Sequence, residues 1–237
     1  MAGQAPYQIS SFIKMLPIKQ KVSLLLLILV LSVSGIIAIN NGKNDINKYL
    51  LQEHLNYWVK DDTGRDKEWE KVQQYLEQAE SSYITDPDTL GYGARLYEWA
   101  IILHSDEERK SGNYLTQVKT RQIESIHLRP LWPYGWAELT NTLQKNKHFD
   151  SIFQHTFRNA MYLGHQEDRI QIELSNIGLN QWSHLSVENR KIFIPFLRNS
   201  ARKHASELIQ LKHNKISRLI LCNGVKNNTV ITKHCNN

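Results

Sequence analysis

The stretch WAELTNTLQKNKHFDSIFQHTFRNA, residues 136–160, carries the clearest fold signal in this chain. Its apolar residues recur every three or four positions, which is the spacing that places side chains on one face of an α-helix. They form two stripes, Trp136, Leu139 and Leu143, then Phe149, Ile152, Phe153, Phe157 and Ala160. A short polar segment separates the stripes, and such short connections join antiparallel neighbours. The stretch therefore predicts a pair of antiparallel helices.

The same helical period recurs on both sides of this stretch. Further apolar stripes indicate helices over residues 69–83, 90–101, 115–126, 170–177 and 194–208. Asp88 is placed to cap one of these helices, and Pro195 is expected to kink another or to stand near its start. Six prolines and eleven glycines are too few for a turn-rich β architecture, and the only strand candidate is Thr229 to Thr232. We therefore predict an all-α fold class.

The paired stripes of residues 136–160 resemble the tetratricopeptide repeat. In that repeat an aromatic residue and leucines mark the first helix, and a large, large, small pattern marks the second. Pro130 stands near the place where the repeat ends the preceding helix pair. The stretch lacks the glycine that is usual after Leu139, and Phe153 stands where alanine is usual. The resemblance implies degenerate, stacked helix pairs, with a second arguable unit around residues 67–104.

Residues 22–39, VSLLLLILVLSVSGIIAI, form an uninterrupted run of eighteen uncharged and mostly aliphatic residues. As a helix this run reaches about 27 Å, close to the ~30 Å hydrocarbon thickness of a bilayer. Lys14, Lys19 and Lys21 precede it, and the first acidic residue is Asp45. The positive-inside rule therefore places the N-terminus in the cytoplasm and residues 40–237 across the membrane.

A cleaved signal peptide is the alternative interpretation of this run. Signal peptides usually have an apolar region of about 7–15 residues that ends at a small-residue cleavage site. The run is longer, and Ile36 before Ala38 is a poor match to such a site, so we expect an uncleaved anchor. The predicted organisation is a cytoplasmic arm (1–21), a transmembrane helix (22–39), a short juxtamembrane helix and linker (40–66), a periplasmic tetratricopeptide-like domain (67–222) and a disulfide-closed tail (223–237).

Composition indicates a folded chain, because 41% of its residues are hydrophobic and 22% are charged. The net charge is +6, and three of the basic residues lie before the transmembrane run. The remaining excess is small and is expected to be evenly spread, which argues against nucleic acid as a partner.

The two cysteines, Cys222 and Cys235, both lie in the last sixteen residues. In an extracytoplasmic compartment they are able to pair, and the bond would close a loop of about 14 residues. Two unrelated free thiols are the alternative. We predict the disulfide, because a polar tail with little else to hold it gains most from such a bond.

No sequence motif indicates catalysis. The chain has no H-E-x-x-H, C-x-x-C, G-x-S-x-G or phosphate-loop motif, and its ten histidines are scattered, so no metal or cofactor is predicted. Glycan-cleaving enzymes use two carboxylates, and the candidates for that role are Glu68, Glu70, Glu167, Asp168 and Glu173. Such residues on exposed helix faces or helix starts are usually solvating charges. We therefore predict a protein that is not an enzyme.

One cluster of aromatic residues and prolines stands out at residues 129–139, RPLWPYGWAEL. In the packing interpretation this segment is a corner between helix pairs, with Pro133 opening a helix and Trp136 as a core residue. In the binding interpretation Arg129, Trp132 and Tyr134 form a platform for a carbohydrate or a peptide. We favour the packing interpretation.

This segment resembles the R-P-x-W-P-Y-x-W-A motif of the membrane-anchored accessory proteins of bacterial exopolysaccharide and capsule synthesis, the VpsP type. The N-terminal anchor, the paired cysteines, Gly164 and the group Gly178-Leu179-x2-Trp182 resemble the same family. His165-Gln166-Glu167 stands where the family has a glycine-proline-tryptophan run. The resemblance implies an inner-membrane protein with a periplasmic helical domain that assists polysaccharide assembly as an adaptor or scaffold, with other proteins of that machinery as partners. A glycan hydrolase or ligase, or an envelope scaffold unrelated to polysaccharide, remains the alternative.

Overall fold

The computed structural model describes residues 17–60, 65–82, 85–104, 108–211, 214–226 and 228–235. These residues form ten α-helices and one 3-10 helix, with no strand among them, so the all-α prediction is confirmed. The helices are α2 (Ile18–Lys60), α3 (Arg65–Glu80), α4 (Pro87–Leu103), α5 (Glu108–Leu128), α6 (Pro133–Lys145), α7 (Ser151–Leu163), α8 (Asp168–Asn180), η1 (Trp182–His184), α9 (Val187–Gln210), α10 (Lys215–Gly224) and α11 (Thr229–Cys235).

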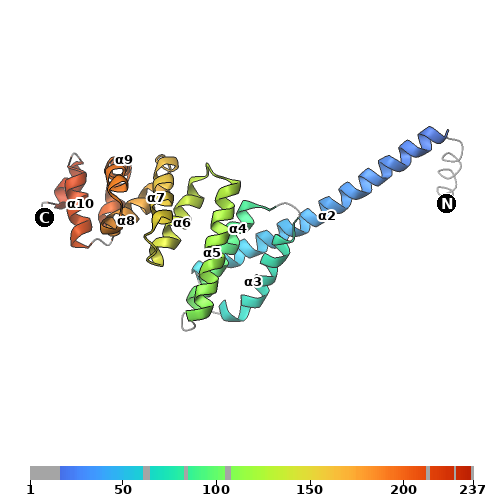
Figure 1. The fold of residues 1–237 in the computed structure, drawn as a ribbon, viewed down its shortest axis with the longest axis horizontal. Helices are drawn as coiled ribbons and strands as arrows, with labels where there is room; N and C mark the ends of the chain where they lie inside the picture. The colour runs from blue at the N-terminus through green and yellow to red at the C-terminus, as the bar shows by residue number, and fades with distance from the viewer. Residues whose placement is uncertain are drawn as a thin grey trace, which may run out of the picture.

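The helices stand in a row that begins at the long helix α2 (Figure 1). The first half of α2 projects away from the molecule, and its second half packs on α3 and α4. Beyond them consecutive helices pack as pairs, α4 with α5, α6 with α7 and α8 with α9. Helix α10 lies at the end of the row that is farthest from the N-terminus.

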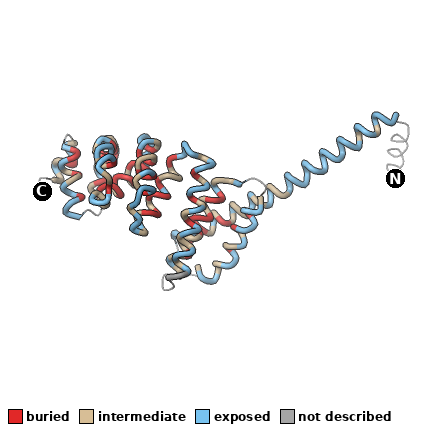
Figure 2. The backbone as a smooth tube through the Cα atoms, in the orientation of Figure 1, coloured by how far each residue is buried: buried red, intermediate tan, exposed pale blue. Residues whose placement is uncertain are grey.

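Two buried clusters hold these helices together (Figure 2). The larger cluster runs from α5 to α11 and contains the fully buried rings of Phe153, Phe157 and Phe193. The smaller cluster joins α2, α3 and α4 through Leu51, Leu55, Trp58, Val72, Leu76 and Leu96. Burial of apolar surface is the main favourable term in folding, so each cluster fixes the helices that contribute to it.

The helix pair predicted over residues 136–160 is confirmed as α6 and α7. Pro133 opens α6, where the N–H that proline lacks would have no helical partner in any case. Asp150 caps α7, because its carboxylate accepts hydrogen bonds from the backbone N–H groups of Ile152 and Phe153 at 3.0 and 3.1 Å. The relation of this pair to the tetratricopeptide repeat stays a prediction.

Helix α2 corrects the prediction of a separate juxtamembrane helix. The transmembrane run and the residues after it form one helix of 43 residues, which reaches about 65 Å. No proline occurs within it to remove a backbone hydrogen bond, and Leu51, Leu55 and Trp58 hold its far end in the smaller cluster. Of the predicted linker, residues 61–64 lie outside the described residues.

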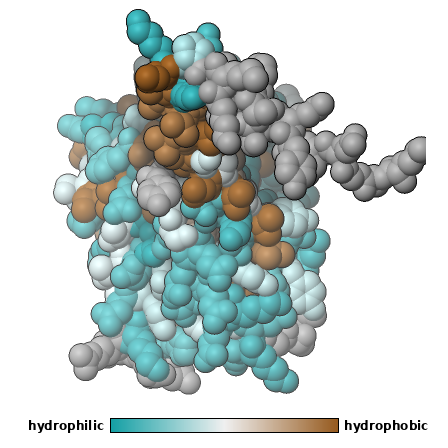
Figure 3. All heavy atoms as spheres, turned by 90° about the vertical axis from the view of Figure 1, so that its right-hand side faces the viewer, coloured by the Kyte–Doolittle hydropathy of each residue, from teal (hydrophilic) through white to brown (hydrophobic). Residues whose placement is uncertain are grey.

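The first half of α2 is the strongest feature of the molecular surface. Among the described residues, α2 is the one helix long and apolar enough to cross a membrane, and its apolar window is not buried in the domain. Figure 3 looks at the molecule from that end and shows hydrophobic residues gathered on the projecting helix, in front of a mostly hydrophilic domain. Exposed apolar surface of this extent marks a membrane or protein contact, so α2 is a candidate membrane anchor.

The strand predicted at Thr229 to Thr232 is wrong, because the segment lies in helix α11. Asn228 starts this helix, since its side-chain oxygen accepts from the backbone N–H groups of Val230 and Ile231, both at 3.1 Å. Ile231 is also fully buried. Strand propensity of β-branched residues is a weak preference, and here a helix cap and a buried side chain override it.

Two further local predictions are corrected. The cap of α4 is Asp86 rather than Asp88, because the Asp86 carboxylate accepts from the backbone N–H of Thr89 at 3.1 Å. Pro195 lies inside α9 rather than near its start, and the non-helical backbone in α9 is at His204. Proline at an interior position costs a backbone hydrogen bond, which the packing of α9 in the larger cluster offsets.

Cys222 of α10 and Cys235 of α11 are joined as a disulfide, with their Cα atoms 5.8 Å apart. This distance lies inside the range of about 4.4–6.8 Å that disulfides require. The bond ties the two last helices to each other, so the tail is a helical hairpin rather than an extended end.

We expect no thiol to be alkylated when the full-length protein is isolated without reductant and then denatured in the presence of an alkylating agent. The variant Cys222→Ser serves as the control, since it should expose one thiol per chain, at Cys235. Loss of the bond should lower the free energy of unfolding by roughly 3 kcal/mol. Two free thiols in the unaltered protein would contradict the disulfide.

Candidate functional site

A small pocket lies where α4, the end of α5 and the start of α6 meet. We call it the corner pocket, and its volume is about 120 Å³. It brings together all three residues of the binding interpretation, Arg129, Trp132 and Tyr134. The other lining residues are Pro87, Asp88, Gly91, Tyr92, Arg95, Ser125, Gly135 and Glu138.

Arg129 clamps the end of α5 to the start of α4. Its two terminal guanidinium nitrogens donate to the two carboxylate oxygens of Asp88, at 2.6 and 3.3 Å. Such a bidentate pair fixes orientation as well as distance. Asp88 lies in the first turn of α4, where a carboxylate also interacts favourably with the helix dipole. The first role of Arg129 is therefore to hold this corner of the fold.

Trp132 and Tyr134 form the aromatic wall of the corner pocket. Their ring centroids lie 5.2 Å apart, and 51% of Trp132 is exposed. The Tyr134 hydroxyl donates to the Glu167 carboxylate at 3.1 Å, and Glu167 stands at the start of α8. Tyr134 thus links two helix pairs, whereas the Trp132 ring remains about half open to solvent.

Trp136 lies at the rim of the larger cluster, which corrects its expected place in the core. It is only partly buried. Its indole N–H donates to the carbonyl oxygen of Pro130 at 2.8 Å, and its ring meets His155 of α7 at a centroid distance of 5.6 Å. Trp136 therefore belongs to the corner packing, although with less buried area than a core tryptophan.

The sequence analysis did not identify Tyr92, Arg95 and Glu138 as candidate site residues, although all three line the corner pocket. Tyr92 and Arg95 stand three residues apart on α4, and this spacing places them on one helix face. This spacing is the feature of the sequence that could have grouped Tyr92 with Arg95. No sequence pattern indicates that this face meets Glu138 of α6, because the contact depends on how the two helix pairs stack.

The corner pocket adjoins a row of carboxylates from three helices, Glu98 of α4, Glu138 of α6 and Glu173 of α8. Burial among protein atoms raises the pKa of Glu138 to about 7, and the neighbouring Glu98 adds to this rise. Glu138 is nevertheless an exposed residue that borders the pocket, so its carboxyl group is accessible to solvent. Burial also raises the pKa of Glu173, and the positive charge of Arg169 opposes that change.

The carboxylates considered from the sequence do not converge on one place: Glu68, Glu70, Glu167, Asp168 and Glu173. Glu68 accepts a hydrogen bond from the indole of Trp58 at 3.3 Å, beside the smaller cluster. Asp168 pairs with His204 at 3.2 Å. Of the five, Glu173 joins the carboxylate row. The others are structural or exposed groups in two separate places, Glu68 and Glu70 on α3 and Glu167 and Asp168 at the start of α8.

The lining of the corner pocket combines aromatic, polar and charged groups. Ser125 carries a hydroxyl in its wall, and this hydroxyl donates to the carbonyl oxygen of Pro87 at 3.1 Å. In the described part of the chain, no three His, Cys, Asp or Glu side chains are grouped to hold a metal ion. An aromatic face beside arginines and a carboxylate suits a polar ligand with an apolar side.

Comparison of the chain with known protein families, with curated protein sequences and with solved structures gave no significant match.

Truncation of the two tryptophans should have unequal effects on stability. Trp136→Ala removes a partly buried ring and a hydrogen bond, so we expect a loss of about 2 kcal/mol in the free energy of unfolding. Trp132→Ala removes a half-exposed ring and should cost less than about 1 kcal/mol. Thermal melts of the full-length protein in detergent measure both, with Tyr162→Ala, which is 79% exposed on α7, as the control. A larger loss for Trp132→Ala than for Trp136→Ala would contradict this assignment.

Glu138 should make the folded state less stable as the pH rises. Its pKa is about 7 in the folded protein, above the ordinary value of 4.5, so the folded state holds a proton that the unfolded state has lost. Stability from Glu138 is therefore full at acid pH and declines as the pH rises through about 7. The Glu138→Gln variant has no carboxyl group to ionise at this position. The difference between its melting temperature and that of the unaltered protein should therefore shift in favour of the variant as the pH rises from 4.5 to 7. A constant difference across this range would contradict the raised pKa.

Proposed function

We propose that this chain is a non-enzymatic, membrane-anchored adaptor. In this proposal α2 crosses the inner membrane of a bacterium with the N-terminus in the cytoplasm. The helical domain then stands in the periplasm, where it holds proteins of polysaccharide synthesis or export together. The resemblance of residues 129–137 to the accessory proteins of exopolysaccharide clusters supports the pathway, and the three lysines before the apolar run of residues 22–39 support the orientation.

The observation that carries the proposal is the continuity of α2. One helix supplies the apolar membrane-length segment and also three core residues of the domain, Leu51, Leu55 and Trp58. A flexible linker would let the domain move freely, whereas a continuous helix holds it at a set height and orientation above the bilayer. Fixed placement beside a membrane is what an adaptor for membrane proteins requires.

The stacked helix pairs supply the surface for partners. Rows of paired helices present extended faces that bind helices or peptide segments. The corner pocket offers Trp132, which is half exposed, together with Arg95 and Arg129. Tryptophan and arginine are the residue types that most often dominate binding energy at protein interfaces. The tetratricopeptide-like arrangement is part of this proposal.

A glycan hydrolase or ligase is the second candidate, and the raised pKa of Glu138 favours it. A carboxyl group with a pKa of about 7 is suited to act as a general acid near neutral pH. Glycosidases pair such an acid with a second carboxylate, and Glu98 is the neighbour available to Glu138. Glu98, however, accepts a hydrogen bond from the Thr142 hydroxyl at 2.9 Å, in a contact between α4 and α6.

Photo-crosslinking in the native bacterium tests the adaptor. A benzoylphenylalanine placed at Trp132 should give discrete adducts that contain proteins of polysaccharide synthesis or export. The matched control carries the same group at Tyr162, which is more exposed but lies outside the corner pocket, and should give none of them. Adducts with proteins unconnected to polysaccharide would instead support a general envelope scaffold, and equal adducts from both positions would contradict the site.

The double variant Glu98→Gln and Glu138→Gln separates the adaptor from the enzyme. Both changes keep the shape of the side chain and remove acid–base chemistry. An adaptor should then keep polymer output at the level of the unaltered protein, with the Trp132 adducts still formed. Loss of output with normal protein level and normal adducts would favour the enzyme.

A further inference from the structure

The positive charge of this chain is concentrated at its C-terminal end. Residues 187–237 contain ten Lys and Arg residues against two Asp and Glu residues, whereas the whole chain contains 29 and 23. The preceding residues therefore carry slightly more acidic than basic groups. This corrects the expectation of an evenly spread excess. Helices α9, α10 and α11 thus form a basic end, opposite to the membrane helix in the row (Figure 1).

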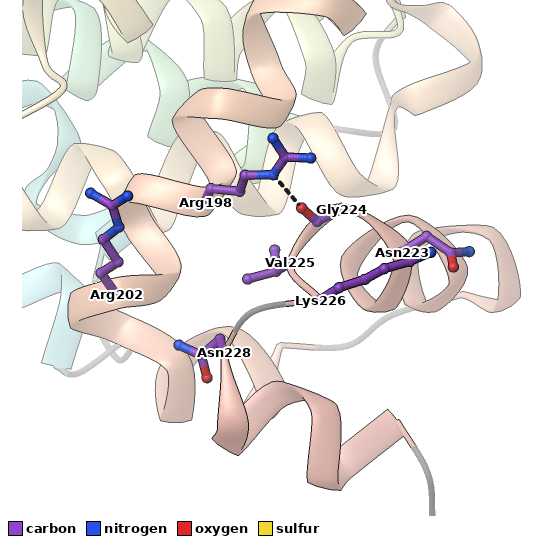
Figure 4. Close-up of a pocket in the computed structure, with 7 residues that line it drawn as sticks. All are labelled: Arg198, Arg202, Asn223, Gly224, Val225, Lys226 and Asn228. Carbon is purple, nitrogen blue, oxygen red and sulfur yellow. Dashed lines mark hydrogen bonds between the residues drawn. The ribbon is translucent and has the colours of Figure 1, made fainter.

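The largest of the pockets described for this structure lies in this basic end, and Figure 4 shows its walls. We call it the basic pocket, and its volume is about 490 Å³. Arg198 and Arg202 reach it from α9, and Lys226 reaches it from the connection between α10 and α11. The remaining lining residues are Asn223, Gly224, Val225 and Asn228, so no carboxylate is among the residues that line it.

The walls of the basic pocket are held in place by contacts on either side of it. Arg198 donates from Nε to the carbonyl oxygen of Gly224 at 2.7 Å, which joins α9 to the end of α10. Asn228 donates from its side chain to the carbonyl oxygen of Ala201 at 2.7 Å, which joins α11 to α9. The disulfide of Cys222 ties α10 to α11. The pocket is therefore preformed, which lowers the cost of binding a ligand.

No carboxylate in the wall of the basic pocket neutralises its three cations. Arg198 and Arg202 stand four residues apart on α9, and like charges at that spacing repel each other. Lys226 adds a third positive charge from the opposite wall. Within the described residues, the Arg202 guanidinium and the Lys226 ammonium group make no hydrogen bond or ion pair, and Lys226 is held only through its backbone carbonyl, which accepts from the Thr232 hydroxyl at 3.0 Å. A bound anion would relieve this repulsion.

We propose that the basic pocket binds a phosphate group of a soluble ligand. Phosphate carries nearly two negative charges and three strong acceptor oxygens, which matches three cations better than a carboxylate with one charge does. Arginine presents planar paired donors that fit phosphate oxygens, and lysine adds a point charge. The side-chain amide of Asn223 supplies a further donor in the wall.

The position of the basic pocket favours a soluble phosphate over a lipid headgroup. The pocket lies between α9, α10 and α11, at the far end of the row from the projecting half of α2. If α2 is the membrane anchor, headgroups of the same bilayer lie at the opposite end of the molecule. The inference of an anion site does not depend on the corner pocket, whereas the choice of a soluble ligand rests on the membrane anchor of the proposed function.

Calorimetric titration of the full-length protein in phosphatidylcholine nanodiscs with inorganic pyrophosphate tests the proposal. Arg202→Gln and Lys226→Gln should each weaken binding roughly tenfold to a hundredfold, since each removes a charge-assisted hydrogen bond. Lys191→Gln is the matched control, because it removes the same charge from α9 outside the pocket, and it should change the affinity less than about twofold. Higher salt should weaken binding, as screening of exposed charges requires.

Three results would overturn the proposal. The first is no measurable binding of pyrophosphate at low salt, and the second is an equal loss in Lys191→Gln and Arg202→Gln, which would indicate only general attraction to the basic end. The third is binding of citrate, a carboxylate probe of comparable charge, as tightly as pyrophosphate. A second set of nanodiscs that contain phosphatidylglycerol should leave the affinity for pyrophosphate unchanged. A marked loss there would assign the pocket to lipid headgroups and contradict a soluble ligand.

Discussion

The packing of the second half of α2 against α3 and α4 is the constraint on which the rest of the structure depends. Trp58 is fully buried there, and its ring meets Trp69 and Trp99 at centroid distances of 6.5 Å. Aromatic pairs of this kind add to the free energy that their buried area supplies. Because the same helix continues into the apolar segment, the position of that segment is coupled directly to the domain.

Close contacts between neighbouring helices hold the other helices of the row in place. Gly178 of α8 faces the ring of Phe193 of α9 so closely that a Cβ atom at this position would overlap the ring. Gly164, at the end of α7, lies against Ile170 of α8 in the same way. These two glycines allow neighbouring helices to approach within the larger cluster, so the row is held by shape as well as by apolar area.

The two pockets offer different chemistry. The corner pocket combines an open aromatic ring with arginines and a carboxylate whose pKa is about 7. The basic pocket presents three cations in a preformed hollow. If the first binds a protein and the second a phosphate-bearing ligand, the domain has separate surfaces for partner and ligand.

The sequence by itself determined the helical fold class, the apolar segment of membrane-spanning length and the pair α6 and α7, because each depends on a period or a run within one segment. It also singled out Arg129, Trp132 and Tyr134, since aromatic residues and prolines gather in a few positions there.

The tertiary structure alone decided that α2 is continuous, because packing of Leu51, Leu55 and Trp58 lies far along the chain from the apolar run. It alone decided that residues 229–235 are helical, where a cap and the burial of Ile231 outweigh propensity. The stacking of separate helices brings Glu138 near Glu98. It also places Lys226 and Arg198 in the wall of one pocket. No local pattern specifies such meetings, since they depend on how whole helix faces fit together.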